Sequence, residues 1–171
     1  AWIDELSAWA DGLPVPRGIL IVSAHWEAAP LGLSAVQPSN VVYDFGGFDP
    51  RYYRMRYDTP DATTLAREVL AALPDGSGVH EHASRGLDHG AWVPLKVMYP
   101  GAGIPVLQLS LPTQDPQRLL QLGASLRGLR ERGLGMSLSS RTGARDVGHL
   151  QRHFPVLLES GLNVCMIGLI R

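Results

Sequence analysis

The chain has 171 residues, 45% of them hydrophobic, and a formal net charge of -1 at pH 7. This length suits one domain with a hydrophobic core, and the near-neutral charge, with no basic patch among aromatic residues, argues against nucleic acid as a partner. No apolar run approaches the roughly 18 residues of a membrane helix. A single cysteine, Cys165, excludes a disulfide framework and a cysteine-based zinc site, so a reduced, cytoplasmic setting is expected.

Apolar runs of strand length alternate along the chain with segments of helical periodicity. This alternation predicts an α/β fold, a single-domain layered sheet that is largely parallel with helices on both faces. Segment 51–57 alternates as an edge strand would, and Trp2 and Trp9 are expected in the core. The expected helices are 1–13, 60–73, 91–99, 116–130 and 147–160, and the expected strands are 19–22, 31–36, 104–111, 133–137 and 163–170.

The apolar run 19–22 leads directly into His25, Trp26 and Glu27. Ligands of open α/β sheets bind beyond the carboxyl ends of the strands, where a histidine can hold a metal or move a proton. On an extended chain His25 and Glu27 point to the same side, so an imidazole and a carboxylate can serve one site. The structural alternative is a histidine capped in a loop.

A second histidine, His89, stands between Asp88 and Gly90 at the expected start of a helix. The glycine leaves room for close approach of backbone or ligand. A neutral histidine at this place is a usable base near pH 7, and a protonated one is a usable acid.

The irregular stretch 37–50 gathers Tyr43, Asp44, Phe45 and Phe48 around two glycines. These residues predict either a hydrophobic loop folded onto the body or one wall of a pocket for a flat ligand. Farther along, His80 and His82 alternate around Glu81. Such a pair can bind metal, but its polar surroundings favour a solvated edge.

Four motifs, occurring in a characteristic order and spacing, carry a family resemblance. They are Ile21–Glu27, Tyr43–Phe48, Gly86–Leu95 with Met98–Pro100, and Ile104–Leu111. Together they resemble the class III extradiol ring-cleavage dioxygenases, in the branch of the DOPA dioxygenases. The resemblance covers about residues 1–112. It implies that 1–171 is a single domain of this type that lacks its N-terminal segment and part of its C-terminal portion.

The resemblance also implies an oxidoreductase that opens a catechol ring with O2 at a non-haem metal, Fe(II) or Zn(II). Both catechol oxygens would chelate the metal, which needs few protein ligands and several open positions. The implied partners are a small aromatic catechol and O2, and a homo-oligomer is left open. By motif matching, the implied residues are His25 as metal ligand, His89 as acid/base, Tyr43, Asp44, Phe45, Phe48 and Trp26 in the substrate pocket, and Glu27 and Asp88 in support.

Three departures from the family pattern concern the other ligands. The family carries a His-Gly-x-Pro motif before its first helix, and this chain begins at that helix. Gly143 stands where a family histidine is expected, and His153 resembles a further ligand on a late helix, with His149 as its rival. Both late histidines could equally lie on the polar face of that helix.

Two other functions therefore remain open. The missing ligands favour a non-catalytic relative that binds an aromatic ligand or acts as a subunit. A zinc hydrolase would instead use His25, Glu27 and another histidine to activate a water molecule.

Overall fold

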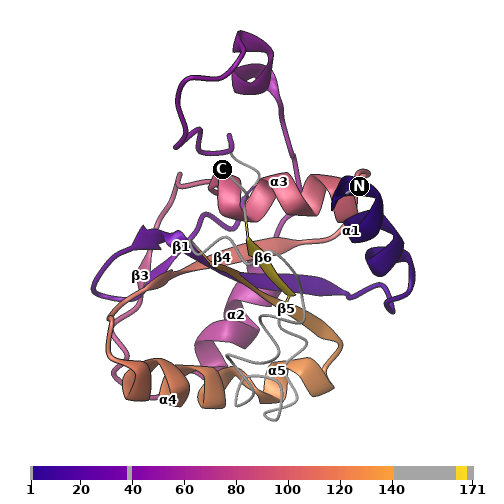
Figure 1. Cartoon of the computed structure of the whole chain (residues 1–171). Helices are drawn as coiled ribbons and strands as arrows, with labels where there is room; N and C mark the ends of the chain where they lie inside the picture. Colours follow the sequence, from indigo (N-terminus) through magenta and orange to yellow (C-terminus); the bar gives the residue numbers. More distant parts are fainter. Residues whose placement is uncertain (1, 38–39, 141–164, 169–171) are drawn as a thin grey trace.

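The computed structural model describes residues 2–37, 40–140 and 165–168. Six strands of this described part form one sheet in the order β3-β2-β4-β1-β5-β6. Figure 1 shows the sheet crossing the molecule between two layers of helices. The strands are β1 (Gly18–Glu27), β2 (Gly32–Leu33), β3 (His80–Glu81), β4 (Val106–Leu111), β5 (Leu134–Ser140) and β6 (Cys165–Gly168).

The sheet is largely parallel, as the sequence predicts. Strand β1 lies in the interior of the sheet and pairs in parallel with β4 on one side and β5 on the other. The pairs β2–β3 and β5–β6 are also parallel, whereas β2 runs antiparallel to β4. Because β1 has a strand on each edge and helices on each face, its start reads as an unbroken apolar run with Ile19, Leu20 and Ile21 all buried.

Helices cover both faces of the sheet (Figure 1). On one face, Ile19 and Ile21 of β1 share a buried cluster with Trp92 of α3. On the other face, Leu20 shares a second cluster with Leu65 of α2. The expected α/β fold with helices on both faces is therefore confirmed. The helices are α1 (Trp2–Asp11), α2 (Thr63–Ala72), α3 (His89–Met98), α4 (Pro116–Leu126) and α5 (Gly128–Glu131).

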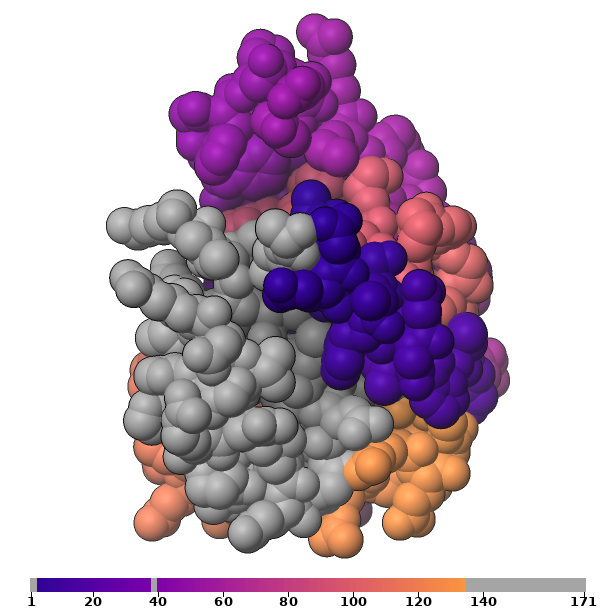
Figure 2. Space-filling view, turned by 45° about the vertical axis from the view of Figure 1, so that its right-hand side comes forward, coloured from indigo at the N-terminus to yellow at the C-terminus, as the bar shows by residue number. Residues whose placement is uncertain are grey.

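Between β2 and α2 the chain rises above α3 as a long excursion, residues 40–58, which we call the aromatic loop. Figure 2 shows it as a lobe standing on the body. Its tip is a short 3-10 helix, η1 (Pro50–Arg54). Asp49 caps this turn by accepting a hydrogen bond from the Arg51 backbone N–H at 2.9 Å, and proline suits the first turn of a helix. The edge strand expected at 51–57 is therefore wrong.

Other sequence expectations need smaller corrections. The strand expected at 31–36 contains only the two residues of β2, and the helix expected at 116–130 is divided into α4 and α5. Trp9 is 42% exposed and so is not a core residue, while Ala10 fills the buried position of α1. The helix expected at 147–160 lies outside the described residues. No helix in the described ranges is long and apolar enough to cross a membrane.

Leu109 on β4 is fully buried between β1, β2 and the α2 side of the sheet. We expect Leu109→Ala to lower the free energy of unfolding by about 2–5 kcal/mol, because the cavity cannot collapse within the layered core. Leu120→Ala is the matched control, since Leu120 on α4 is 46% exposed, and should change stability by about 0.5 kcal/mol or less. Denaturant unfolding of both variants measures the difference, and equal losses would contradict this layering.

Candidate metal centre and active site

His25 lies near the carboxyl end of β1, on the strand that the sheet holds most firmly. The side chains of Ile19 and Ile21 pack toward α3, and the ladder with β4 shifts register after Val22, before His25. The His25 backbone N–H donates to Ser23 Oγ at 3.2 Å. The ring of His25 meets the ring of His89, with centroids 4.1 Å apart and planes at 46°. The structure therefore brings together the two histidines on which the sequence prediction rests.

His89 is the first residue of α3, and its place depends on the cap before it. Asp88 is completely buried and caps the helix by accepting from the Ala91 backbone N–H at 3.1 Å. The Gln108 side chain on β4 holds Asp88 twice: its Nε2 donates to Asp88 Oδ2 at 2.5 Å, and its Oε1 accepts from the Asp88 backbone N–H at 3.0 Å. This contact fixes the start of α3 over the sheet.

Asp44 reaches His89 from the aromatic loop. Its Oδ1 accepts a hydrogen bond from the His89 backbone N–H at 3.1 Å and lies 2.6 Å from His89 Nδ1. Partial burial opposes ionisation of Asp44, but the hydrogen bonds from the ring and backbone of His89 outweigh it and lower the pKa of the carboxyl. An ionised carboxylate only accepts hydrogen bonds, so Nδ1 carries the proton, and a neutral His89 keeps the lone pair on Nε2.

His25, Asp44 and His89 form a compact group of metal-ligating residues. Each offers one ligand atom, and these atoms all lie within 4.8 Å of one another. The side chains of His89 and Asp44 are 15% and 25% exposed, so the group is partly covered and still accessible. Two imidazoles and one carboxylate are a donor set suited to a non-haem iron or zinc ion. The three residues can therefore bind a metal together. Alternatively, some of them can bind the metal while the others act as acid and base beside it.

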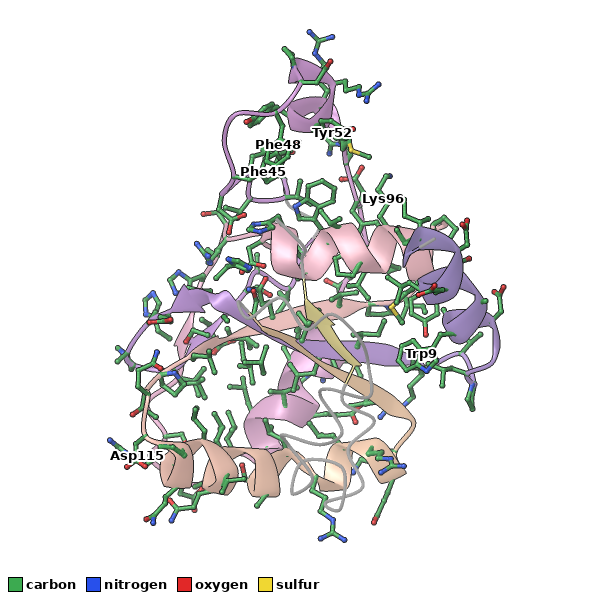
Figure 3. The ribbon with its side chains drawn as sticks, viewed as in Figure 1. Trp9, Phe45, Phe48, Tyr52, Lys96 and Asp115 are labelled. Atoms are coloured by element: carbon green, nitrogen blue, oxygen red, sulfur yellow. The ribbon has the colours of Figure 1, made fainter. Side chains whose placement is uncertain are left out.

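The aromatic loop stands over this group. Phe45 meets the His89 ring edge to face, with centroids 5.8 Å apart, and packs against Tyr53 at 5.1 Å. Tyr43 donates its hydroxyl hydrogen to the Met55 carbonyl at 2.7 Å, which holds the two arms of the loop together. Figure 3 shows Phe45, Phe48 and Tyr52 gathered above the start of α3. Phe48 is 60% exposed, so it is the least enclosed aromatic ring among the predicted pocket residues.

The remaining predicted residues, Trp26, Glu27 and Asp88, do not share one pocket. Trp26 is 6% exposed and packs edge to face on His82, with Arg85 stacked on its ring. Glu27 is exposed at the end of β1. Asp88 supports His89 by capping the helix that begins there. None of the Asp88 hydrogen bonds described above involves the ring of His89. His153, His149 and Gly143 lie outside the described residues, so their predicted roles stay predictions.

A small cavity lies at the base of the aromatic loop, lined by Ser34, Val41, Tyr57 and Leu87 among others. Its volume is about 20 Å³, room for about one water molecule. None of the three metal-ligating side chains lines it, so it is a packing gap apart from the candidate metal centre.

Sequence reasoning missed Gln108 and the contact that Asp44 makes with His89. The sequence analysis places Gln108 within an apolar strand and gives it no role. A polar residue among buried neighbours is the signal that could have identified it. Asp44 was predicted as a pocket residue, whereas it binds His89 directly. That pairing joins residues 45 positions apart in sequence, and no local pattern encodes it.

Residues 2–135 match the family described as the catalytic LigB subunit of aromatic ring-opening dioxygenase. The chain is 40% identical over 135 residues to the 4,5-DOPA dioxygenase extradiol of Beta vulgaris, covering 75% of this chain and 50% of that protein. It is 35% identical over 123 residues to the protein of the same name in Escherichia coli K12, covering 71% and 45%.

A solved structure gives the same picture. The uncharacterized protein JW3007 of Escherichia coli K12 superposes with a TM-score of 0.67 and 28% identity, covering 84% of this chain and 54% of that one. The chain thus has the fold of the ring-opening dioxygenases, and it belongs to the LigB family. The resemblance to class III extradiol dioxygenases is confirmed. The chain spans about half the length of the curated relatives it matches.

The buried contact between Gln108 and Asp88 can be tested by mutation. Gln108→Leu removes a donor from a buried carboxyl, so we expect it to lower the free energy of unfolding by about 1–3 kcal/mol. It should also shift the His89 ring resonances, because the start of α3 loses its tie to β4. Gln117→Leu makes the same change at an exposed position of α4 and is the control. Unchanged His89 resonances in a destabilised Gln108→Leu would show that the helix start is held by other contacts.

Proposed function

We propose that the protein opens the ring of a catechol-type substrate with O2 at a non-haem metal, by extradiol cleavage. The single observation that carries this proposal is the convergence of His25, Asp44 and His89 at the carboxyl end of β1, beneath an aromatic loop. Membership of the LigB family supports the same chemistry. The names of the curated relatives point to a DOPA-type catechol, and a small aromatic substrate is what the loop would accommodate.

His25 is the proposed metal ligand, with His153 as a further ligand suggested by its sequence context. A metal ion bound there, Fe(II) for catalysis or Zn(II), would supply the binding of catechol oxygens and the electron transfer to O2. The proposed metal site lies at the edge of the sheet, where the aromatic rings of the loop can exclude water from one side.

His89 is the proposed acid/base. The Asp44 carboxylate accepts the Nδ1 hydrogen and so directs the lone pair of Nε2 away from the loop backbone. In this form Nε2 can take a proton from a catechol hydroxyl and later return it to an oxygen of the product. Asp44 is therefore a positioning residue that acts through His89.

Phe45 completes the proposed arrangement. Its ring packs on the His89 ring and on Tyr53, which limits rotation of the imidazole and offers an apolar surface to a flat substrate. A cytoplasmic location is part of the proposal and is supported by the single cysteine.

The whole protein, loaded with Fe(II), should take up O2 and form a yellow ring-opened product from a catechol. His25→Ala should abolish both signals and release the metal, because it removes a ligand. Chelation should abolish activity reversibly, with recovery on adding back Fe(II). Neither colour nor O2 uptake from the iron-loaded whole protein would reject the proposal.

Metal analysis separates this function from the non-catalytic alternative. One metal ion per chain that is lost in His25→Ala excludes a relative without a working centre. Metal well below one per chain, with an aromatic ligand still bound, would favour that alternative. Ester or amide turnover without O2 uptake would favour the zinc hydrolase.

The role of Asp44 gives a separate prediction. Asp44→Asn should lower kcat about 10- to 100-fold, the usual effect of losing a residue that orients a histidine at a metal site. Bound metal should stay at the wild-type level, and Asp75→Asn, an exposed change in the turn before β3, is the control. If Asp44→Asn loses its metal instead, then Asp44 is itself a ligand.

A further inference from the structure

Two neighbouring imidazoles lie at the edge of the sheet, outside the group described above. Strand β3 is the outermost strand on its side of the sheet. His80 is its first residue, and His82 follows its last one. The two rings meet edge to face, with centroids 4.4 Å apart. Neither belongs to the group formed by His25, Asp44 and His89, so the pair has no part in the proposed centre.

Hydrogen bonds to β2 and its surroundings hold the backbone of both histidines. The His80 N–H donates to the Leu31 carbonyl at 2.8 Å, and the His82 N–H donates to the Leu33 carbonyl at 2.9 Å. Residues two positions apart on an extended chain point to the same side, and the ring contact agrees with this. Because the backbone is fixed, a ligand that binds both rings has only side-chain rotation to restrain, which lowers the entropic cost of binding.

Both imidazoles are free to accept a ligand. Among the described residues, the side chains of His80 and His82 make ring contacts but no hydrogen bond or ion pair. His80 is exposed and His82 is partly exposed. Burial, with added effects of the positive charges of His80 and Arg85, lowers the pKa of the His82 imidazole. At neutral pH this ring is therefore uncharged and keeps a lone pair that a metal can use.

The spacing of the two rings suits a shared metal ion. Two imidazoles that bind one ion at about 2.1 Å, with an angle of about 90–110° at the metal, have ring centroids about 4.5–5.2 Å apart. The observed separation is 4.4 Å, so a small rotation of the exposed His80 ring reaches this geometry. Gly32 on β2 leaves space for the second ring, because a Cβ there would lie 3.3 Å from His82 Nε2.

We propose that His80 and His82 together bind a divalent ion that prefers imidazole ligands, Cu²⁺ or Zn²⁺, at a second metal site on the edge of the sheet. Water would complete the coordination, and Cu²⁺ should bind more tightly than Zn²⁺. The ion would join the two ends of the two-residue strand β3 and so stabilise this edge. The positive charge of Arg85 opposes a cation, so binding should be weaker than at a centre with three protein ligands. The site does not depend on the proposed function.

Titration of the whole protein with Cu²⁺ tests the proposal without turnover. The measurement is made by calorimetry in the His25→Ala variant, which lacks the ligand proposed for the other centre. Adding His80→Gln or His82→Gln should weaken Cu²⁺ binding at the edge site at least about 10-fold, since even the outer contacts of metal ligands are worth that much. Bound Cu²⁺ should also quench part of the tryptophan fluorescence, because the His82 ring lies 5.2 Å from the ring of Trp26.

Glu81→Gln is the matched control. Glu81 is exposed and stands between the two histidines, with its side chain on the other side of the strand, so Cu²⁺ binding and quenching should stay unchanged. Circular dichroism checks the fold of each variant, and His82→Asn serves as a second change at the less exposed ring. Cu²⁺ affinity and quenching that are the same in the folded histidine variants as in their parent would overturn the site.

Discussion

The side chain of Gln108 ties the interior of the sheet to the first turn of α3, and the candidate site depends on this contact. Gln108 satisfies both the backbone N–H and the carboxyl of Asp88, which in turn caps the helix. Because all these groups are buried, each must find its partner or the fold loses stability. The result is that His89 is held at a fixed height above β1, within ring contact of His25.

The aromatic loop adds the third member of the group from a distant part of the chain. Asp44 holds His89 by its ring and its backbone, and the Tyr57 hydroxyl donates to the Tyr99 carbonyl at 3.0 Å, at the other end of α3. Lys96 also donates to the Arg56 carbonyl at 3.0 Å. The loop is thus attached to both ends of α3, so a residue near its base can serve the site while its tip stays exposed.

The end of β1 contacts two later segments of the chain, the start of α3 and the segment after β3. His25 meets His89 at the start of α3, and Trp26 packs on His82 directly after β3, a strand that runs antiparallel to β1. His25 and Trp26 are neighbours on β1, yet they point to opposite faces of the strand. One strand end therefore contributes His25 to the proposed metal centre and packs into the edge of the sheet through the buried Trp26.

The sequence by itself determined the α/β class, the central strand that carries His25 near its end and the helix start at His89, because strand and helix periodicities and the motif order are local properties. The strand expected at 51–57 was wrong for a local reason, because Asp49 and Pro50 start η1 there, whereas the exposure of Trp9 on α1 was decided by tertiary packing. Only the tertiary structure paired Asp44 with His89 and Arg85 with Trp26. These residues lie far apart in the chain, and the packing of the loop and sheet edge, which no local pattern encodes, brings them together.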